Sequence, residues 1–115
     1  MPILNATKHK ILAEKYRLCK SEFSKLKGLM FTRKYPYALL FDMAKEKIVN
    51  LHMFCVFYPI DVLWLDSNKR IVHLKKRFVP FTFTLMSRKA RYIIELENGT
   101  INRTKTSVGD TVKFK

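Results

Sequence analysis

Residues 51–65, with the sequence LHMFCVFYPIDVLWL, form the most apolar stretch of the chain and decide the predicted fold class. Pro59 has no N–H to donate to a central strand ladder, so we expect two strands here, over residues 50–57 and 60–66. A stretch this apolar should be buried. Residues 66–69, Asp-Ser-Asn-Lys, follow as a strong turn signal.

Alternating apolar and polar residues predict further strands on both sides of this stretch. We expect them over residues 9–19, 37–43, 70–78, 91–96 and 111–115, with alternation also at Phe81, Phe83 and Leu85 and a turn at residues 45–47. Short helices are expected over residues 21–27, between an N-cap at Ser21 and Gly28, and over residues 100–105. These elements predict a mainly β fold, a compact antiparallel β-sandwich or barrel with one or two short helices.

Composition limits the organisation and the cellular setting. The chain has 115 residues, with 23 Lys and Arg against 9 Asp and Glu, and a formal net charge of +14. This length predicts a single domain over residues 1–115. Apolar runs are too short to span a bilayer, and the first ten residues lack the apolar core of a secretory signal, so we expect a cytoplasmic protein. The absence of Gln and the abundance of Lys are typical of a thermophilic source.

Neither cysteine nor histidine chemistry forms a convincing motif. Cys19 and Cys55 are the two cysteines, and we expect free thiols more readily than a bridge between them. His52 and Cys55 make one ligand pair, whereas a structural zinc site needs four ligands. Glycine-rich phosphate loops and nucleophile motifs are absent from the sequence. We therefore predict no metal, no cofactor and no catalytic residues.

The basic residues are concentrated in one block. Residues 69–91 carry eight Lys and Arg side chains and no acid. Period-2 alternation in the strand over residues 70–78 places His73, Lys75 and Arg77 on one face, and Arg88 and Lys89 follow in sequence. Such a basic face predicts salt-dependent binding of a nucleic acid or another polyanion. The alternative is a solvated basic surface without a binding role.

Asp61 is the one acid inside the most apolar stretch. A carboxylate there needs a partner, and Arg33 and Arg91 are candidate countercharges because each neighbours an apolar element. Asp61 could then anchor a ligand in a pocket with Arg91, His52 and Trp64. The alternative is a structural carboxylate that accepts backbone N–H bonds or fixes a turn.

The order of these segments resembles domain-of-unknown-function family 192. The resemblance covers roughly residues 9–114 and rests on the helix exit, the apolar strands and the last turn. The segments that carry it are Gly28-Leu29-Met30-Phe31, Ala38-Leu39-Leu40-Phe41, His52-Met53-Phe54, Pro59-Ile60-Asp61-Val62-Leu63-Trp64-Leu65-Asp66, Val79-Pro80, Ala90-Arg91-Tyr92-Ile93-Ile94-Glu95-Leu96 and Val108-Gly109-Asp110. It implies a compact β-rich domain without an established activity. The familiar form carries a Trp-Met-Lys-Asn-like stretch at the positions of His52-Met53-Phe54-Cys55.

Three functions remain open from the sequence. The leading prediction is a non-enzymatic module that binds a ligand or partner near residues 59–61. The second is a nonspecific nucleic-acid-binding protein that uses the basic face. The third is a small enzyme in which Asp61 and His52 act as acid and base.

Overall fold

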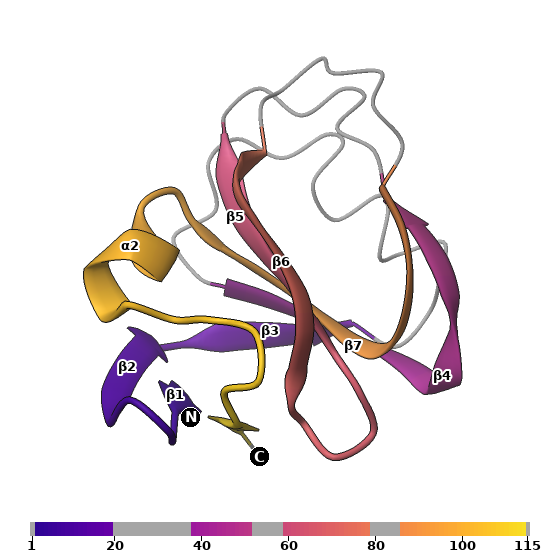
Figure 1. Cartoon of the computed structure of the whole chain (residues 1–115), viewed down its shortest axis with the longest axis horizontal. Helices are drawn as coiled ribbons and strands as arrows, with labels where there is room; N and C mark the ends of the chain where they lie inside the picture. The colour runs from indigo at the N-terminus through magenta and orange to yellow at the C-terminus, as the bar shows by residue number, and fades with distance from the viewer. Residues whose placement is uncertain (1, 20–37, 52–58, 79–85, 115) are drawn as a thin grey trace.

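The computed structural model of the chain describes residues 2–19, 38–51, 59–78 and 86–114 (Figure 1). A small sheet joins the two ends of the chain in the order β2-β1-β8. Its strands are β1 (Ile3–Asn5), β2 (Lys10–Ala13) and β8 (Val112–Lys113). Both pairings in this sheet are antiparallel.

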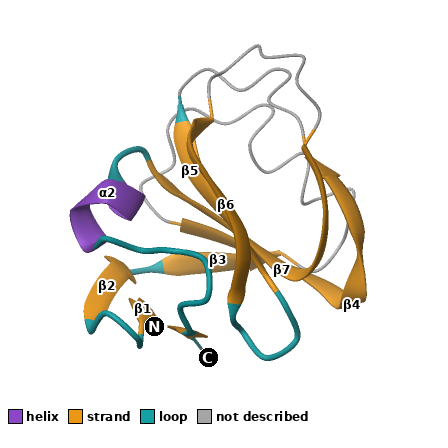
Figure 2. Cartoon of the chain, viewed as in Figure 1, coloured by secondary structure: helices purple, strands orange, loops and turns teal. Residues whose placement is uncertain are grey.

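A larger sheet has the strand order β3-β4-β7-β5-β6 (Figure 2). It contains β3 (Tyr16–Cys19), β4 (Ala38–Leu51), β5 (Ile60–Leu65), β6 (Ile71–Phe78) and β7 (Met86–Glu97). The β3–β4 pair is parallel, and the other pairs are antiparallel. One short helix, α2 (Thr100–Thr104), follows β7. The predicted mainly β fold is confirmed.

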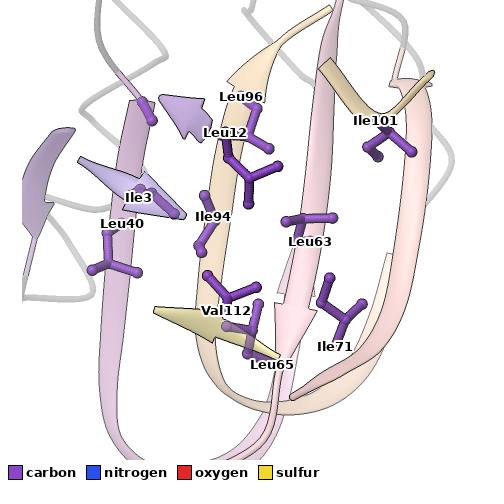
Figure 3. Close-up of a cluster of buried hydrophobic side chains, with 11 residues drawn as sticks. Ile3, Leu12, Leu40, Leu63, Leu65, Ile71, Ile94, Leu96, Ile101 and Val112 are labelled. Atoms are coloured by element: carbon purple, nitrogen blue, oxygen red, sulfur yellow. The ribbon is translucent and has the colours of Figure 1, made fainter. Parts of the chain in front are cut away.

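The main hydrophobic core lies between the two sheets and α2 (Figure 3). The larger sheet contributes alternate residues of its central strands, such as Leu63 and Ile94. The small sheet contributes Ile3, Leu12 and Val112, and α2 contributes Ile101. Since the small sheet contains both the first and the last strand, burial of this core holds the ends of the chain together.

The central strands of the larger sheet are buried on their second face as well. All six residues of β5 are buried. Leu39 and Phe41 of β4, Val62 and Trp64 of β5, and Ile93 of β7 alternate with the residues of the main core and are also buried. A strand buried on both faces has a nearly continuous apolar sequence, which explains the run at residues 60–65.

A polar network fixes the turn that precedes β8. The side chain of Asp110 accepts hydrogen bonds from Asn5 Nδ2 at 2.9 Å, from the Lys8 ammonium at 2.8 Å and from the Ser107 N–H at 3.0 Å. Asn5 also donates to the hydroxyl of Thr106. Burial raises the pKa of Asp110, but the hydrogen bonds from Asn5, Lys8 and the Ser107 N–H, together with the charge of Lys8, outweigh burial and lower that pKa overall. These contacts connect β1 with the C-terminal turn.

Several predicted boundaries are corrected by strand geometry. The expected strand over residues 9–19 is divided between β2 and β3, which belong to different sheets. The expected turn at residues 45–47 lies inside β4, where a bulge with Ala44 at a φ of 69° bends the strand but does not end it. The predictions over residues 21–27, 50–57 and 81–85 fall mainly or wholly outside the described residues. The turn at residues 66–69 and the helical turn near residue 100 are confirmed.

Two bulges interrupt the simple alternation predicted for β6. The register with β5 shifts near Val72, so Ile71 joins the main core while His73 faces Trp64. It shifts again at Lys76 and Arg77, where two residues oppose Asp61. Arg77 has a φ of 48° in this second bulge. His73 and Lys75 therefore share a face, and the second bulge takes Arg77 out of the alternation.

The carboxylate of Asp61 stabilises this bulge from inside the protein. Asp61 is 1% exposed. Its Oδ1 accepts the N–H of Arg77 at 2.9 Å, and its Oδ2 accepts the N–H of Ile101, in the first turn of α2, at 2.8 Å. Asp61 thus holds the end of β6 and the start of α2 together, which agrees with the structural alternative considered from the sequence.

Replacing Asp61 with Leu should destabilise the fold strongly. The change leaves the N–H groups of Arg77 and Ile101 without their acceptor, and hydrogen bonds to a charged group contribute about 1.5–3 kcal/mol each. We expect a loss of about 3–6 kcal/mol for Asp61→Leu and a smaller loss for Asp61→Asn, which keeps one acceptor oxygen. Urea unfolding of the three proteins measures both losses.

A second variant tests the separation of Asp61 from Arg91. Arg91 pairs with Asp42, so the losses from Asp61→Asn and Arg91→Met should simply add in the double variant. A clear coupling between these two substitutions would contradict the contacts described here.

Candidate functional site

Glu95 occupies the centre of the second face of the larger sheet. In the strand register it lies between Leu39 of β4 and Val62 of β5. Its neighbours along β7, Ile94 and Leu96, belong to the main core, so alternation places Glu95 on the opposite face. The pairing of β7 with β4 and with β5 therefore places the Glu95 carboxyl group in an apolar layer.

One oxygen of the Glu95 carboxyl group is buried without a hydrogen-bond partner among the described residues. Glu95 is 4% exposed, and its Oε2 atom has no hydrogen-bond partner there. Burial raises the pKa of Glu95 well above its ordinary value of 4.5, because desolvation disfavours the charged form. Burial therefore favours the neutral, protonated form of Glu95 over the carboxylate.

Trp64 provides a second unpartnered polar atom on the same face. It is fully buried, and its Nε1–H has no acceptor within the described ranges. Trp64 pairs with Ile93 and Val62 pairs with Glu95, so Trp64 and Glu95 are diagonal neighbours on adjacent strands. Such neighbours lie roughly 7–8 Å apart, which is within the span of one small molecule.

The surroundings of these two atoms are mostly apolar. Phe41 of β4 flanks Ile93 on the side opposite Trp64. The ring of His73, on β6, packs against Trp64 with 5.0 Å between centroids and a tilt of 53°. Leu39, Phe41, Val62 and Ile93 are all buried. We call the group formed by Glu95, Trp64, His73 and Phe41 the Glu95–Trp64 site.

The pocket predicted around Asp61 is not assembled as expected. Asp61 lies on the main-core face and is occupied by two backbone N–H groups, whereas Trp64 lies on the other face. Arg91 pairs with Asp42 at 2.8 Å, and this hydrogen bond raises the pKa of Arg91. The countercharge assignment of Arg91 to Asp61 was wrong because Arg91 lies five residues from the register partner of Asp61, Leu96. His52 and the alternative countercharge Arg33 lie outside the described residues.

The predicted basic residues are placed on two separate strands. Lys75 and Arg77 are exposed on β6, the edge of the larger sheet, and His73 is half-buried on the same strand. Lys89 is exposed on β7, where it pairs with Ile48 of β4. Because β5 lies between β6 and β7, Lys89 does not join the cations of β6. The side chain of Arg88 is outside the described part.

Metal ligands and membrane spans give no further candidate. Within the described ranges, no three His, Cys, Asp or Glu side chains are grouped so that they could hold a metal ion. Among the same residues, no helix has the length and apolar character to cross a bilayer.

Glu95 is the residue that the sequence interpretation missed. Its segment, Ile93-Ile94-Glu95-Leu96, places an acid inside an apolar strand just as Asp61 is placed in β5. The same reasoning about a buried carboxylate applied to both residues. The sequence alone did not indicate that Glu95 is buried, because a glutamate at that position of an alternating strand also fits a solvent-exposed face.

The burial of Glu95 predicts a pH-dependent stability that Glu95→Gln removes. Between a pH of about 4.5 and its raised folded pKa, the folded protein holds a proton that the unfolded chain has released. Stability should therefore fall as pH rises through this window, by at most about 1.4 kcal/mol per pH unit. Urea unfolding of both proteins between pH 4 and pH 9 measures the difference.

Asp110 acts as an internal reference in this experiment. It is present in both proteins, and its contribution to stability is lost only as pH falls from its ordinary value of 3.8 through its lowered folded pKa. Identical slopes for the wild-type protein and Glu95→Gln would show that Glu95 is ionised in the folded state.

A family model and several relatives match nearly the whole chain. The model of domain-of-unknown-function family 192, described as Uncharacterized ACR, matches residues 3–114. A UPF0127 protein from the thermophilic archaeon Thermococcus sibiricus is 34% identical over 115 residues, which cover 98% of this chain and 74% of the relative.

Two solved structures share the fold. A protein of unknown function from Novosphingobium aromaticivorans has a TM-score of 0.87 at 18% identity and covers 99% of this chain and 84% of its own. A candidate transcription regulator from Sinorhizobium meliloti has a TM-score of 0.85 at 23% identity and covers 97% of this chain and 89% of its own. The family match over nearly the whole sequence, together with these relatives, shows that the chain belongs to domain-of-unknown-function family 192.

Proposed function

We propose that this protein is a non-enzymatic binding module that takes a small molecule at the Glu95–Trp64 site. The observation that carries the proposal is the pair of buried polar atoms, Glu95 Oε2 and Trp64 Nε1, which have no hydrogen-bond partners among the described residues. They lie on one face of adjacent strands. An acceptor and a donor placed this way are suited to a ligand that presents both kinds of group.

Buried polar groups without hydrogen-bond partners are costly to a folded protein. A buried donor or acceptor without a partner destabilises a protein by about 1–3 kcal/mol. Buried polar groups in native proteins are almost always hydrogen-bonded, and each exception calls for an explanation, of which a functional role is one. Two exceptions in neighbouring positions are therefore better explained by a binding role than by packing.

The acid/base alternative receives less support from the contacts. Both oxygens of Asp61 accept backbone N–H groups, so this carboxylate has a structural task on the other face of the sheet. Burial raises the pKa of Glu95 and favours its protonated form, but the described residues on its face are predominantly apolar. A binding role uses this environment directly, because apolar walls with a few polar atoms are typical of ligand sites.

Intrinsic fluorescence gives a direct test, because Trp64 is the only tryptophan. The experiment is a titration with a fragment collection that contains neutral, anionic and cationic members. We expect at least one fragment to change the Trp64 emission saturably, and Glu95→Leu to abolish this response. Glu97→Gln, an exposed position on the same strand, is the matched control and should keep it.

Stability provides the second readout for the same variants. Glu95→Leu should raise the free energy of unfolding by about 1–3 kcal/mol, because an uncompensated polar group is replaced by an apolar one. A collection in which no fragment alters the emission would contradict the proposal, and a destabilised Glu95→Leu protein would contradict the claim that the Glu95 carboxyl is uncompensated.

A second candidate function, polyanion binding, is supported by three consecutive exposed cations on an edge strand. Lys75, Lys76 and Arg77 are all exposed on β6, and the chain carries a net charge of +14. Cations along a strand can neutralise successive phosphates and release their counterions. The naming of the Sinorhizobium meliloti protein as a candidate transcription regulator is compatible with this activity.

Two matched triple variants test whether the cations of β6 act as a site. Lys75→Ser/Lys76→Ser/Arg77→Asn removes these cations, and Lys10→Ser/Lys105→Asn/Lys113→Ser removes three exposed cations elsewhere. Each set includes one residue with a positive φ, Arg77 or Lys105, where Asn is tolerated.

The measurement is the salt dependence of binding to DNA duplexes of two unrelated sequences. If each cation neutralises one phosphate, the first triple should reduce the log–log salt slope by about 2–3, and the control should reduce it much less. Equal reductions would assign binding to the overall charge, and no binding at low salt would remove this candidate function.

A further inference from the structure

We propose that the Glu95–Trp64 site selects planar, uncharged molecules that present an adjacent hydrogen-bond donor and acceptor, as a primary amide or a lactam does. This inference rests on the proposed binding function and goes further by naming the chemical class of the ligand. It follows from three properties of the described residues: their hydrogen-bonding groups, their charge and the shape of their side chains.

The hydrogen-bonding groups of the site match an amide on two sides. The indole Nε1–H of Trp64 can only donate, and it has no acceptor among the described residues. A neutral carboxyl group at Glu95 both donates and accepts. An amide edge offers a carbonyl oxygen and an N–H side by side, so it can form two parallel hydrogen bonds with a carboxylic acid. A further acceptor on the molecule would receive the Trp64 N–H.

The charge of the ligand distinguishes this class from carboxylate and cationic ligands. A carboxylate ligand would be desolvated beside the Glu95 carboxyl, with Leu39, Val62 and Ile93 as neighbours that offer it no hydrogen bond. A cationic ligand would have to ionise Glu95, whose burial favours the neutral form. It would also approach a protein with a net charge of +14. An uncharged ligand avoids each of these costs.

The aromatic side chains of the Glu95–Trp64 site favour a flat ligand. Phe41 and Trp64 stand on either side of Ile93 in the strand register and on the same face of the sheet. Both side chains are buried, and the His73 ring lies against Trp64. Aromatic side chains pack on planar groups over a large area with little loss of conformational entropy.

Three molecules of nearly equal shape isolate the charge: benzamide is neutral, benzoate is an anion and benzamidine is a cation. We expect Trp64 fluorescence at neutral pH to give a dissociation constant for benzamide at least about tenfold lower than for either charged analogue, which is about 1.4 kcal/mol. Glu95→Leu should weaken benzamide binding by about tenfold or more, and Glu97→Gln should leave it unchanged.

The variant Glu95→Gln separates a neutral acid from an ionised one. The Gln amide supplies an acceptor and a donor at the same positions, so benzamide affinity should remain within about threefold of the wild-type value. An ionised Glu95 would instead bind benzamidine, and Gln would abolish that binding. This variant also keeps the test valid if Glu95→Leu fails to fold.

The outcomes distinguish the ligand class from the binding function. Tighter binding of benzamidine or benzoate overturns the proposed class and leaves the binding function standing. The same conclusion follows if other fragments act on Trp64 while benzamide does not. If no fragment of any charge changes the Trp64 emission, both the ligand class and the proposed function are rejected.

Discussion

The antiparallel pairing of β5 with β7 is the constraint on which the rest of the structure depends. It sets Asp61 opposite Leu96 and Val62 opposite Glu95, so two carboxyl groups lie on successive rungs and on opposite faces of the sheet. Both are buried. On one face the carboxylate accepts two backbone N–H groups, and on the other face the carboxyl oxygen Oε2 accepts none from the described residues. The first arrangement builds the fold, and the second is the basis of the proposed ligand site.

The satisfied face explains how distant segments are held in place. Asp61 connects the bulge at Arg77 with the first turn of α2, and α2 carries Ile101 into the main core. Asp110 acts similarly near the chain ends, where it accepts hydrogen bonds from Asn5, Lys8 and Ser107. In both places a buried carboxylate replaces water for several donors at once, so that an irregular backbone remains ordered.

Local sequence patterns predicted the strand class and several turns, because apolar alternation and turn chemistry act over a few residues. Register was less accessible. Bulges near Val72 and Arg77 changed which β6 residues share a face. At Ala44 a bulge bends β4, and the strand continues where a turn was expected. The role of Asp61 was among the stated alternatives, but its donors, Arg77 and Ile101, are 16 and 40 residues away. Glu95 was missed because one acid in an alternating strand is compatible with either face.

The most direct test of this account is a ¹³C NMR titration of the Glu95 side-chain carboxyl carbon. Burial raises the pKa of Glu95, so the Glu95 resonance should titrate at a pH well above the ordinary value of 4.5. The signal is assigned by its absence in Glu95→Gln. A Glu95 midpoint at or below 4.5 would show an ionised and compensated carboxylate, and would contradict the claim that this face presents an unsatisfied acid.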